Sequence, residues 1–370
     1  MLFLSLLALA FLAVDFQNVL SHWRGLVLEP AFRRSDDFTI LVPLYGDPKY
    51  FRNSDELRPR QRNVLLCLDV SDPRMARFAP IAVAQGWRVF ETVCEHLPPG
   101  PSELCLKALQ SGAVRTRYAV RVDGDTYAPV DLGYAIAAAE DAGADICSVK
   151  VLPTQQGKIV EALQDIEYEM SMMSRHFRPW TTSGACIIAR RDAMQYVLER
   201  HSHWFPGEDM ETGRIAKHYR MRVRHIDFKV YTDVPETWCA LFRQRRMWWA
   251  GNFRHVVVNF DSNLRMPVWV LYYVFLVYAL AAGKLHHLLG ASLHVMPPLL
   301  LIYTGISLLA NWQVRSRWMI AYPYYSLLQS ALMPFFGVVY YIRIAWKRQT
   351  LGRYLIGFRR PPGFARSVAR

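Results

Sequence analysis

Apolar and polar positions divide the chain into a mixed central part and two apolar ends. Residues 29–262 alternate short apolar runs with polar and charged stretches, as an ordinary globular sequence does. Long apolar runs occupy residues 1–14, 267–283, roughly 295–310 and 319–346. A membrane helix needs about 20 apolar residues, and fewer when its flanks reach the interface. We therefore expect an integral membrane protein whose first run is an uncleaved anchor, since no basic segment precedes it.

Basic residues near these runs predict the orientation of the chain. Arg24, Arg33 and Arg34 follow the first run, which places the central part on the cytoplasmic side of a plasma or inner membrane. The C-terminal tail is also basic, which favours the cytoplasmic side, whereas three further spans would place it on the opposite side of the membrane. We expect the tyrosine- and proline-rich run 319–346 to be the exception, and the number of spans stays open. The predicted parts are a membrane anchor (1–28), a cytoplasmic domain (29–242), an interfacial amphipathic segment (243–266), a transmembrane bundle (267–346) and a basic tail (347–370).

The formal net charge of +13 is compatible with nucleic-acid binding or with an anionic membrane surface. Much of this charge lies beside the apolar runs, so we expect membrane lipid as a partner and no nucleic acid. The six cysteines are irregularly spaced and form no CxxC motif, so their pattern indicates neither a disulfide framework nor a zinc site.

Within the central part, short β-rich runs alternate with helical stretches, which predicts an α/β fold with a mostly parallel sheet. Expected strands cover residues 38–45, 63–70, 87–93, 118–122 and 145–151, and expected helices cover 102–111, 130–142 and 158–177. In such sheets, ligands bind beyond the carboxyl ends of the strands. Acidic residues follow two of these strands: Asp69 and Asp72 the second, and Asp123 and Asp125 the fourth.

Asp123, Gly124 and Asp125 form a candidate metal site. The glycine allows a sharp turn, so that both carboxylates can face one divalent cation. Mg²⁺ or Mn²⁺ held there would bridge the diphosphate of a nucleotide sugar and neutralise the leaving group. A solvated turn is the alternative interpretation of so short a motif.

Two further motifs carry charged residues in a defined context. Glu208 and Asp209 lie where a loop runs into a predicted helix, although the helix dipole alone also favours acids there. Residues 243–251, with the sequence RQRRMWWAG, form a basic and tryptophan-rich segment. Taken alone, this segment indicates an interfacial anchor.

Taken in order, these motifs resemble the processive family 2 glycosyltransferases, which include hyaluronan, cellulose and chitin-oligosaccharide synthases. The resemblance covers about residues 38–252 and depends on VPLYGD, DGDT, SGACIIARR, GEDMETGRI, VPETW and QRRMWWAG in that order. It implies a GT-A nucleotide-sugar domain with N- and C-terminal transmembrane helices. It also implies a membrane-bound, inverting hexosyltransferase that extends a β-linked polysaccharide, such as a capsule or exopolysaccharide, from a UDP-sugar.

The resemblance also implies roles for the matching residues. Asp209 would be the general base that takes the proton from the acceptor hydroxyl. Asp125, helped by Asp123, would hold Mg²⁺ or Mn²⁺. The expected donor-binding residues are Pro43, Tyr45, Gly46, Asp69, Asp72 and Asp123, with Asp69 at the uracil. The expected residues for the acceptor, a saccharide or a lipid-linked sugar, and for the diphosphate are Glu208, Gln244, Arg245, Arg246 and Trp248.

Two departures from the family pattern affect the phosphate contacts. Met247 stands at the arginine of the family's Gln-x-x-Arg-Trp motif, and Gly100-Pro101-Ser102 stands where Gly-Lys is usual. A non-processive enzyme that adds one sugar to a lipid carrier is therefore an alternative. An inactive scaffold subunit of a synthase complex is a further one. The donor sugar, the linkage, the product length and the oligomeric state stay open.

Overall fold

The computed structural model of the chain forms two compact units. The first, which we call the sheet unit, comprises Leu26–Gln155 and Arg175–Val234 with the C-terminal residues. The second, the helical unit, comprises Gln156–Ser174 and Pro235–Ile342 with the N-terminal residues. The structure describes residues 27–44, 51, 63–95, 100–154, 157–176, 178–203, 207–258 and, with gaps, 298–348.

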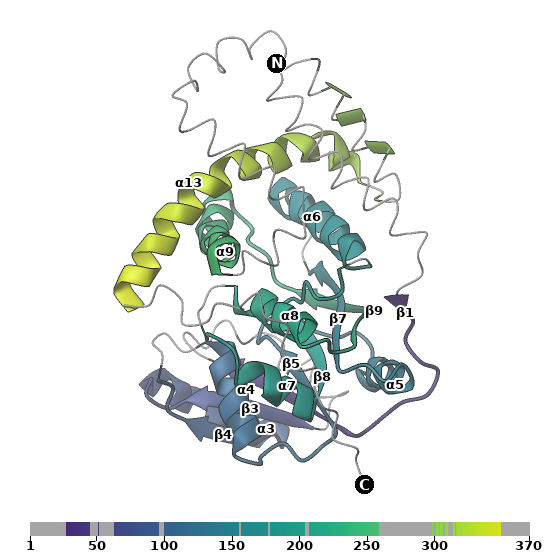
Figure 1. The fold of residues 1–370 in the computed structure, drawn as a ribbon, viewed down its shortest axis with the longest axis vertical. Helices are drawn as coiled ribbons and strands as arrows, with labels where there is room; N and C mark the ends of the chain where they lie inside the picture. The colour runs from purple at the N-terminus through teal and green to yellow at the C-terminus, as the bar shows by residue number, and fades with distance from the viewer. Residues whose placement is uncertain are drawn as a thin grey trace. The chain divides into compact units, whose positions relative to one another are not determined.

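The sheet unit contains a mixed sheet with the strand order β1-β9-β7-β8-β5-β2-β3-β4, and β6 pairs with β9 (Figure 1). Strands β5, β2, β3 and β4 are parallel neighbours, whereas β8 runs antiparallel between β5 and β7. The predicted α/β fold with a mostly parallel sheet is confirmed. The strands are β1 (Val27–Leu28), β2 (Phe38–Leu44), β3 (Val64–Asp69), β4 (Arg88–Thr92), β5 (Tyr118–Val122), β6 (Thr126–Tyr127), β7 (Ile146–Pro153), β8 (Cys186–Arg190) and β9 (Val223–Thr232).

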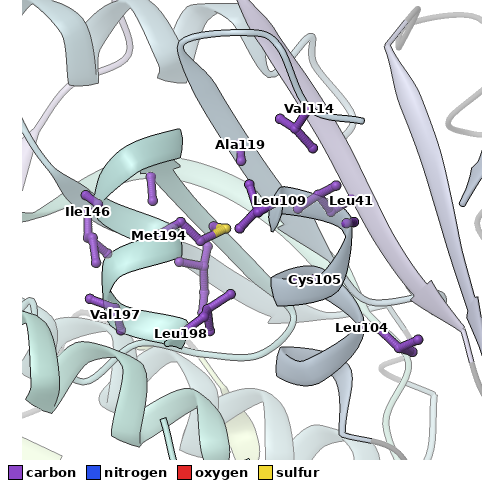
Figure 2. Packing of buried hydrophobic residues seen from close by; sticks show 14 of the residues in the cluster. Leu41, Leu104, Cys105, Leu109, Val114, Ala119, Ile146, Met194, Val197 and Leu198 are labelled. Carbon is purple, nitrogen blue, oxygen red and sulfur yellow. The ribbon is translucent and has the colours of Figure 1, made fainter. Parts of the chain in front are cut away.

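Helices α4, α7 and α8 share one buried apolar cluster with this sheet. Leu109 of α4 and Met194 of α7 belong to the same cluster as Leu41 of β2 and Ile146 of β7 (Figure 2). This cluster holds α4 and α8 against the sheet. The helices of the sheet unit are η2 (Pro73–Arg77, a 3-10 helix), α3 (Phe78–Gln85), α4 (Pro101–Gln110), α5 (Gly133–Asp141), α7 (Arg191–Leu198) and α8 (Glu208–His218).

The helical unit has its own apolar core. Leu163, Ile166 and Met170 of α6 pack in one cluster with Leu241 of α9 and Tyr325 of α13. Their spacing follows one face of a helix, as the sequence predicts. The elements of this unit are α6 (Ile159–Arg175), α9 (Trp238–Val258), η3 (Arg317–Ile320, a 3-10 helix) and α13 (Tyr322–Arg348).

Within the described residues, no helix is long and apolar enough to cross a membrane. This finding contradicts the predicted integral membrane location, and the cytoplasmic side predicted from it is withdrawn as well. The run 319–346 forms most of α13, where polar residues such as Gln329 interrupt the apolar sequence. The other predicted runs lie wholly or largely outside the described residues: 1–14, 267–283 and 295–310.

Candidate active site

The strand order of the sheet reverses at β2, since β3 and β4 lie on one side of it and β5 and β8 on the other. In open α/β sheets, ligands bind beyond the carboxyl ends of the strands at such a reversal. Asp69 is the last residue of β3, Asp123 directly follows β5, and Pro43 is the penultimate residue of β2 between them. The sheet therefore brings three predicted donor-site residues to one edge.

The turn from Asp123 to Asp125 is held closely against the end of β2. The Thr126 N–H donates to the Asp123 carbonyl oxygen (3.0 Å) and closes the turn. A Cβ at Gly124 would lie 2.8 Å from Cδ2 of Leu44, so a larger residue at this position would have to displace that side chain. The two carboxylates therefore project from a backbone that has little freedom to move.

Both carboxylates of this turn lie where their charge is disfavoured. Partial burial, together with the charges of neighbouring carboxylates, raises the pKa of Asp123 to about 7 despite its ion pair with Arg121. Burial and the charge of Asp233 raise the pKa of Asp125 to about 6. A divalent cation would relieve this repulsion.

The carboxylates of this turn can be compared with the ligands that the expected cation needs. The described residues contain no group of three or more His, Cys, Asp or Glu side chains that could hold a metal ion by themselves. Mg²⁺, however, commonly binds through one or two carboxylates, with substrate phosphates and water completing its shell. Asp123 and Asp125 therefore fit a cation that is shared with a phosphate-bearing ligand.

Arg121 connects the turn to two helices, and the sequence motifs did not single it out. Its side chain is 6% exposed, and it is the penultimate residue of β5. Nη2 donates to Oδ1 of Asp123 (3.2 Å), and Nη1 forms an ion pair with Oε1 of Glu208 (2.9 Å). Burial disfavours the guanidinium charge, but the nearby carboxylates outweigh this effect and raise the pKa of Arg121. A charged residue inside an apolar strand was the available sequence signal.

The predicted base, Asp209, is the second residue of α8. This helix begins after Gly207, whose φ of 90° lies in the left-handed region that favours glycine. Oδ2 of Asp209 accepts a hydrogen bond from the Gly184 N–H (2.9 Å), and its carbonyl oxygen accepts one from the Thr182 hydroxyl. The predicted helix start is confirmed, and the loop before β8 fixes the orientation of Asp209.

Gly184 lies where the acidic motifs converge. A Cβ at this position would lie 3.1 Å from Nη2 of Arg121 and 3.3 Å from Oδ2 of Asp123. The same Cβ would lie 3.6 Å from Cβ of Asp209. The structure therefore brings the DGDT, SGAC and GED segments together, although they are far apart in the sequence.

The two aspartates after β3 have different surroundings. Asp69 is buried, and its Oδ1 accepts a hydrogen bond from the Ser71 N–H (2.9 Å). Its Oδ2 is buried, and the thiol of Cys94 is a polar group near this carboxylate. Asp72 instead caps η2 and binds Arg74, whose hydrogen bonds lower the pKa of this carboxyl. Tyr45 and Gly46 lie outside the described residues.

The predicted acceptor residues after Glu208 all lie on α9 in the helical unit. Arg245 is buried, forms an ion pair with Glu167 (2.7 Å) and donates to the side chain of Gln244 (2.8 Å). Its guanidinium also lies 4.0 Å from the ring centre of Trp248, which is 39% exposed. Arg246 donates to the hydroxyl of Tyr340. Gln244 and Trp248 therefore both contact Arg245, whereas Arg246 binds a different side chain.

The family follows from a comparison with known families. Residues 120–314, more than half of the chain, match the family model described as Glycosyl transferase family group 2. The chain belongs to this family. It is therefore a glycosyltransferase, and the predicted enzyme class is confirmed. The processive subfamily of this glycosyltransferase remains a prediction.

Two solved structures are similar to this glycosyltransferase, each at 15% sequence identity. Mannosyltransferase PcManGT from Pyrobaculum calidifontis, in complex with GDP-Man and Mn²⁺, has a TM-score of 0.46, and the match covers 94% of this chain and 99% of that chain. Glucosyl-3-phosphoglycerate synthase from Mycobacterium tuberculosis, in complex with Mn²⁺, UDP and phosphoglyceric acid, has a TM-score of 0.35, and the match covers 60% and 84%. A comparison with curated protein sequences finds no match.

Proposed function

We propose that this family 2 glycosyltransferase has a GT-A fold and transfers a sugar from a UDP-sugar to a growing β-linked saccharide, with inversion at the anomeric carbon. The observation that carries this proposal is the convergence at Gly184, where Asp123, Arg121 and Asp209 approach one point. A carboxylate pair beside an oriented third carboxylate suits a reaction with a diphosphate leaving group and a hydroxyl nucleophile.

Asp209 is the general base of the proposed reaction. The hydrogen bond from the Gly184 N–H occupies Oδ2, so the other oxygen, Oδ1, is the atom that takes the proton of the acceptor hydroxyl. This orientation matters because a base must lie within hydrogen-bond reach of the proton it removes. The hydroxyl oxygen then attacks the anomeric carbon from the face opposite the leaving diphosphate, which inverts the configuration.

Asp123 and Asp125 would hold Mg²⁺ or Mn²⁺. When bound, the cation neutralises charge that develops on the departing diphosphate. The raised pKa values of both aspartates support this assignment, because buried carboxylates with further carboxylates nearby favour a positive partner.

The donor nucleotide is proposed to lie along the ends of β2 and β3. The buried carboxylate of Asp69 would accept a hydrogen bond from the uracil N–H, and Pro43, Tyr45, Gly46 and Asp72 would border the nucleotide. The exposed ring of Trp248 suits the apolar face of an acceptor sugar. Gln244, Arg245 and Arg246 are proposed to support acceptor and diphosphate binding with it.

The alternative is a single transfer to a lipid carrier. Arg245 supports this alternative, since its ion pair with Glu167 competes with any phosphate contact. Met247 supports it as well, because the family's arginine is replaced there. A polymerising enzyme yields products of many lengths, whereas the alternative yields one glycolipid.

A donor screen tests the proposal. The full chain would be incubated with Mn²⁺ and UDP- or GDP-linked sugars, and released nucleotide and product size would be measured. We expect UDP-sugar turnover that EDTA abolishes and that Asp125→Asn lowers about 100-fold or more. Asp141→Asn, at an exposed carboxylate that ends α5, is the control and should match the wild type. Equal turnover in wild type, EDTA and Asp125→Asn would contradict the proposal.

A further inference from the structure

Arg121 and Glu208 form a buried ion pair at the point where three elements meet. Their side chains are 6% and 3% exposed, respectively. Burying two charges is costly unless both are well paired and their remaining polar atoms are satisfied. Such a pair contributes little net stability to the folded protein. Its role is therefore better inferred from the residues that it contacts.

The contacts of the pair reach two helix starts and the acidic turn. Nη1 of Arg121 also donates to Oγ of Ser102 (3.4 Å), in the first turn of α4. Oε2 of Glu208 accepts a hydrogen bond from the Ser102 N–H (3.2 Å). A Cβ at Gly100 would lie only 2.8 Å from the same oxygen, so glycine is needed for this approach. Glu208 therefore occupies the N-terminus of α4 with its own carboxylate.

The backbone of Glu208 is fixed from the opposite side. Its carbonyl oxygen accepts a hydrogen bond from Nε2 of the buried His201 (2.6 Å) and another from the Thr212 hydroxyl (3.2 Å). Nδ1 of His201 accepts from the His203 N–H (3.1 Å), so Nε2 carries the imidazole proton. The first residue of α8 is thus held at both its side chain and its backbone, and Asp209 follows it directly.

We propose that Arg121 and Glu208 are positioning residues that tie the carboxylate of Asp123 to the helix start that carries Asp209. This inference rests on the proposed function and assigns Glu208 a role inside the protein in place of acceptor binding. Glu208 shares the guanidinium of Arg121 with Asp123. If the charge of Glu208 is removed, Arg121 pairs with Asp123 alone and competes more strongly with a divalent cation.

The variant Glu208→Gln tests the inference, because glutamine keeps an acceptor for the Ser102 N–H while losing the charge. Binding of Mn²⁺ in the presence of UDP would be followed by electron paramagnetic resonance, with kcat, KM and Tm measured alongside. We expect Mn²⁺ affinity to fall about 10-fold and kcat to fall about 10- to 100-fold, as when a partner of a metal ligand is removed. The KM for the donor should change less.

The matched control is Arg190→Met. Arg190 forms ion pairs with Asp145 (3.6 Å) and Asp192 (2.6 Å) at the far end of β8, beside the start of β5. This variant should lower Tm but leave Mn²⁺ affinity and kcat unchanged. A second test variant, Arg121→Lys, keeps the charge, but an ammonium cannot hold two carboxylates as a guanidinium fork does. It should lower kcat at least 10-fold with Tm close to that of the wild type.

The outcomes separate this inference from the proposed function. Absence of Mn²⁺ binding by the wild type in the presence of UDP would overturn both. Wild-type binding, combined with kcat and Mn²⁺ affinity within about twofold in Glu208→Gln and Arg121→Lys, would overturn the positioning role alone. A fall in kcat and Mn²⁺ affinity in Glu208→Gln, with neither effect in Arg190→Met, would support it.

Discussion

At the residue scale, Asp123 and Asp125 are two carboxylates that share one turn and repel each other. Burial disfavours their charged forms, and neighbouring carboxylates add to this effect, Asp125 beside Asp123 and Asp233 beside Asp125, so their pKa values are raised to about 7 and about 6. Protons and metal therefore compete for the same oxygens.

This competition predicts a dependence of stability on pH. Asp123 has a pKa of 3.8 when unperturbed and about 7 in the folded protein, so the folded form binds more protons between these values. Its contribution to stability is therefore present at low pH and is lost as pH rises through about 7. In EDTA, the free energy of unfolding of wild type minus that of Asp123→Asn should fall between pH 5 and pH 8. An increase over this interval would contradict the assignment.

Also at the residue scale, the sequence indicated the acidic residues of the site but not Arg121, the arginine that pairs with two of them. Asp123, Asp125 and Asp209 stand in motifs whose spacing can be read along the chain. Arg121 forms an ion pair with Glu208, which is 87 positions away, so only the fold reveals their contact. Asp72 differs from Arg121 in this respect. The sequence made Asp72 a candidate for donor binding, and in the structure its carboxylate binds Arg74, only two positions away.

At the scale of elements, the loop before β8 and helix α8 make a close contact that orients Asp209. A Cβ at Gly213 would lie 1.9 Å from the carbonyl oxygen of Trp180, so the loop backbone lies directly on this helix. The same loop supplies the Thr182 hydroxyl and the Gly184 N–H to Asp209. Gly213 therefore sets the distance between the loop and the base.

This contact predicts that Gly213→Ala lowers both stability and activity. The methyl group cannot fit without a shift of backbone, and overpacking of this kind costs about 1 to 3 kcal/mol. We expect a lower free energy of unfolding in urea and a fall in kcat, because the hydrogen bond between Gly184 and Asp209 is lost. Gly157→Ala, where the nearest atom would lie 3.7 Å away, is the control. Wild-type kcat in Gly213→Ala would argue against the loop as the support of Asp209.

The elements themselves were predicted unevenly. Strands β2, β3 and β5 and helices α4 and α6 lie close to the predicted ranges, because each is a long or clearly bounded apolar pattern. Strand β8 was recognised as a motif only, and its antiparallel direction depends on its partners rather than on its own sequence. Strand β9 alternates buried and less buried residues on a charged sequence, which hid it from a search for apolar runs.

At the scale of the whole molecule, the predicted integral membrane location is contradicted, since none of the described helices combines the length and the apolar sequence of a membrane span. The run 319–346 was expected to be the exception among the spans, because it is rich in tyrosine and proline. In α13, Tyr325 and Gln329 donate to Glu167 of α6, so polar residues within the run bind protein groups. Composition alone does not distinguish a helix that packs against protein from one that packs against lipid.

The family model matches residues 120–314, and the candidate site lies in the sheet unit. The acidic motifs that converge at Gly184 all lie there, and they came from segments that the sequence already ordered correctly. Residues 244–248 lie in the helical unit, where Arg245 is bound to Glu167.

The most direct test of the central claim is the turnover of Asp209→Asn with the best UDP-sugar and its acceptor. Asparagine keeps the size of the side chain and the contact with Gly184 but cannot take a proton. Asp192→Asn is the matched control, since Asp192 is likewise the second residue of a helix, α7. The account predicts that Asp209→Asn lowers kcat about 100- to 10,000-fold with donor affinity unchanged, while Asp192→Asn retains wild-type kcat. Wild-type kcat in a folded Asp209→Asn variant would contradict it.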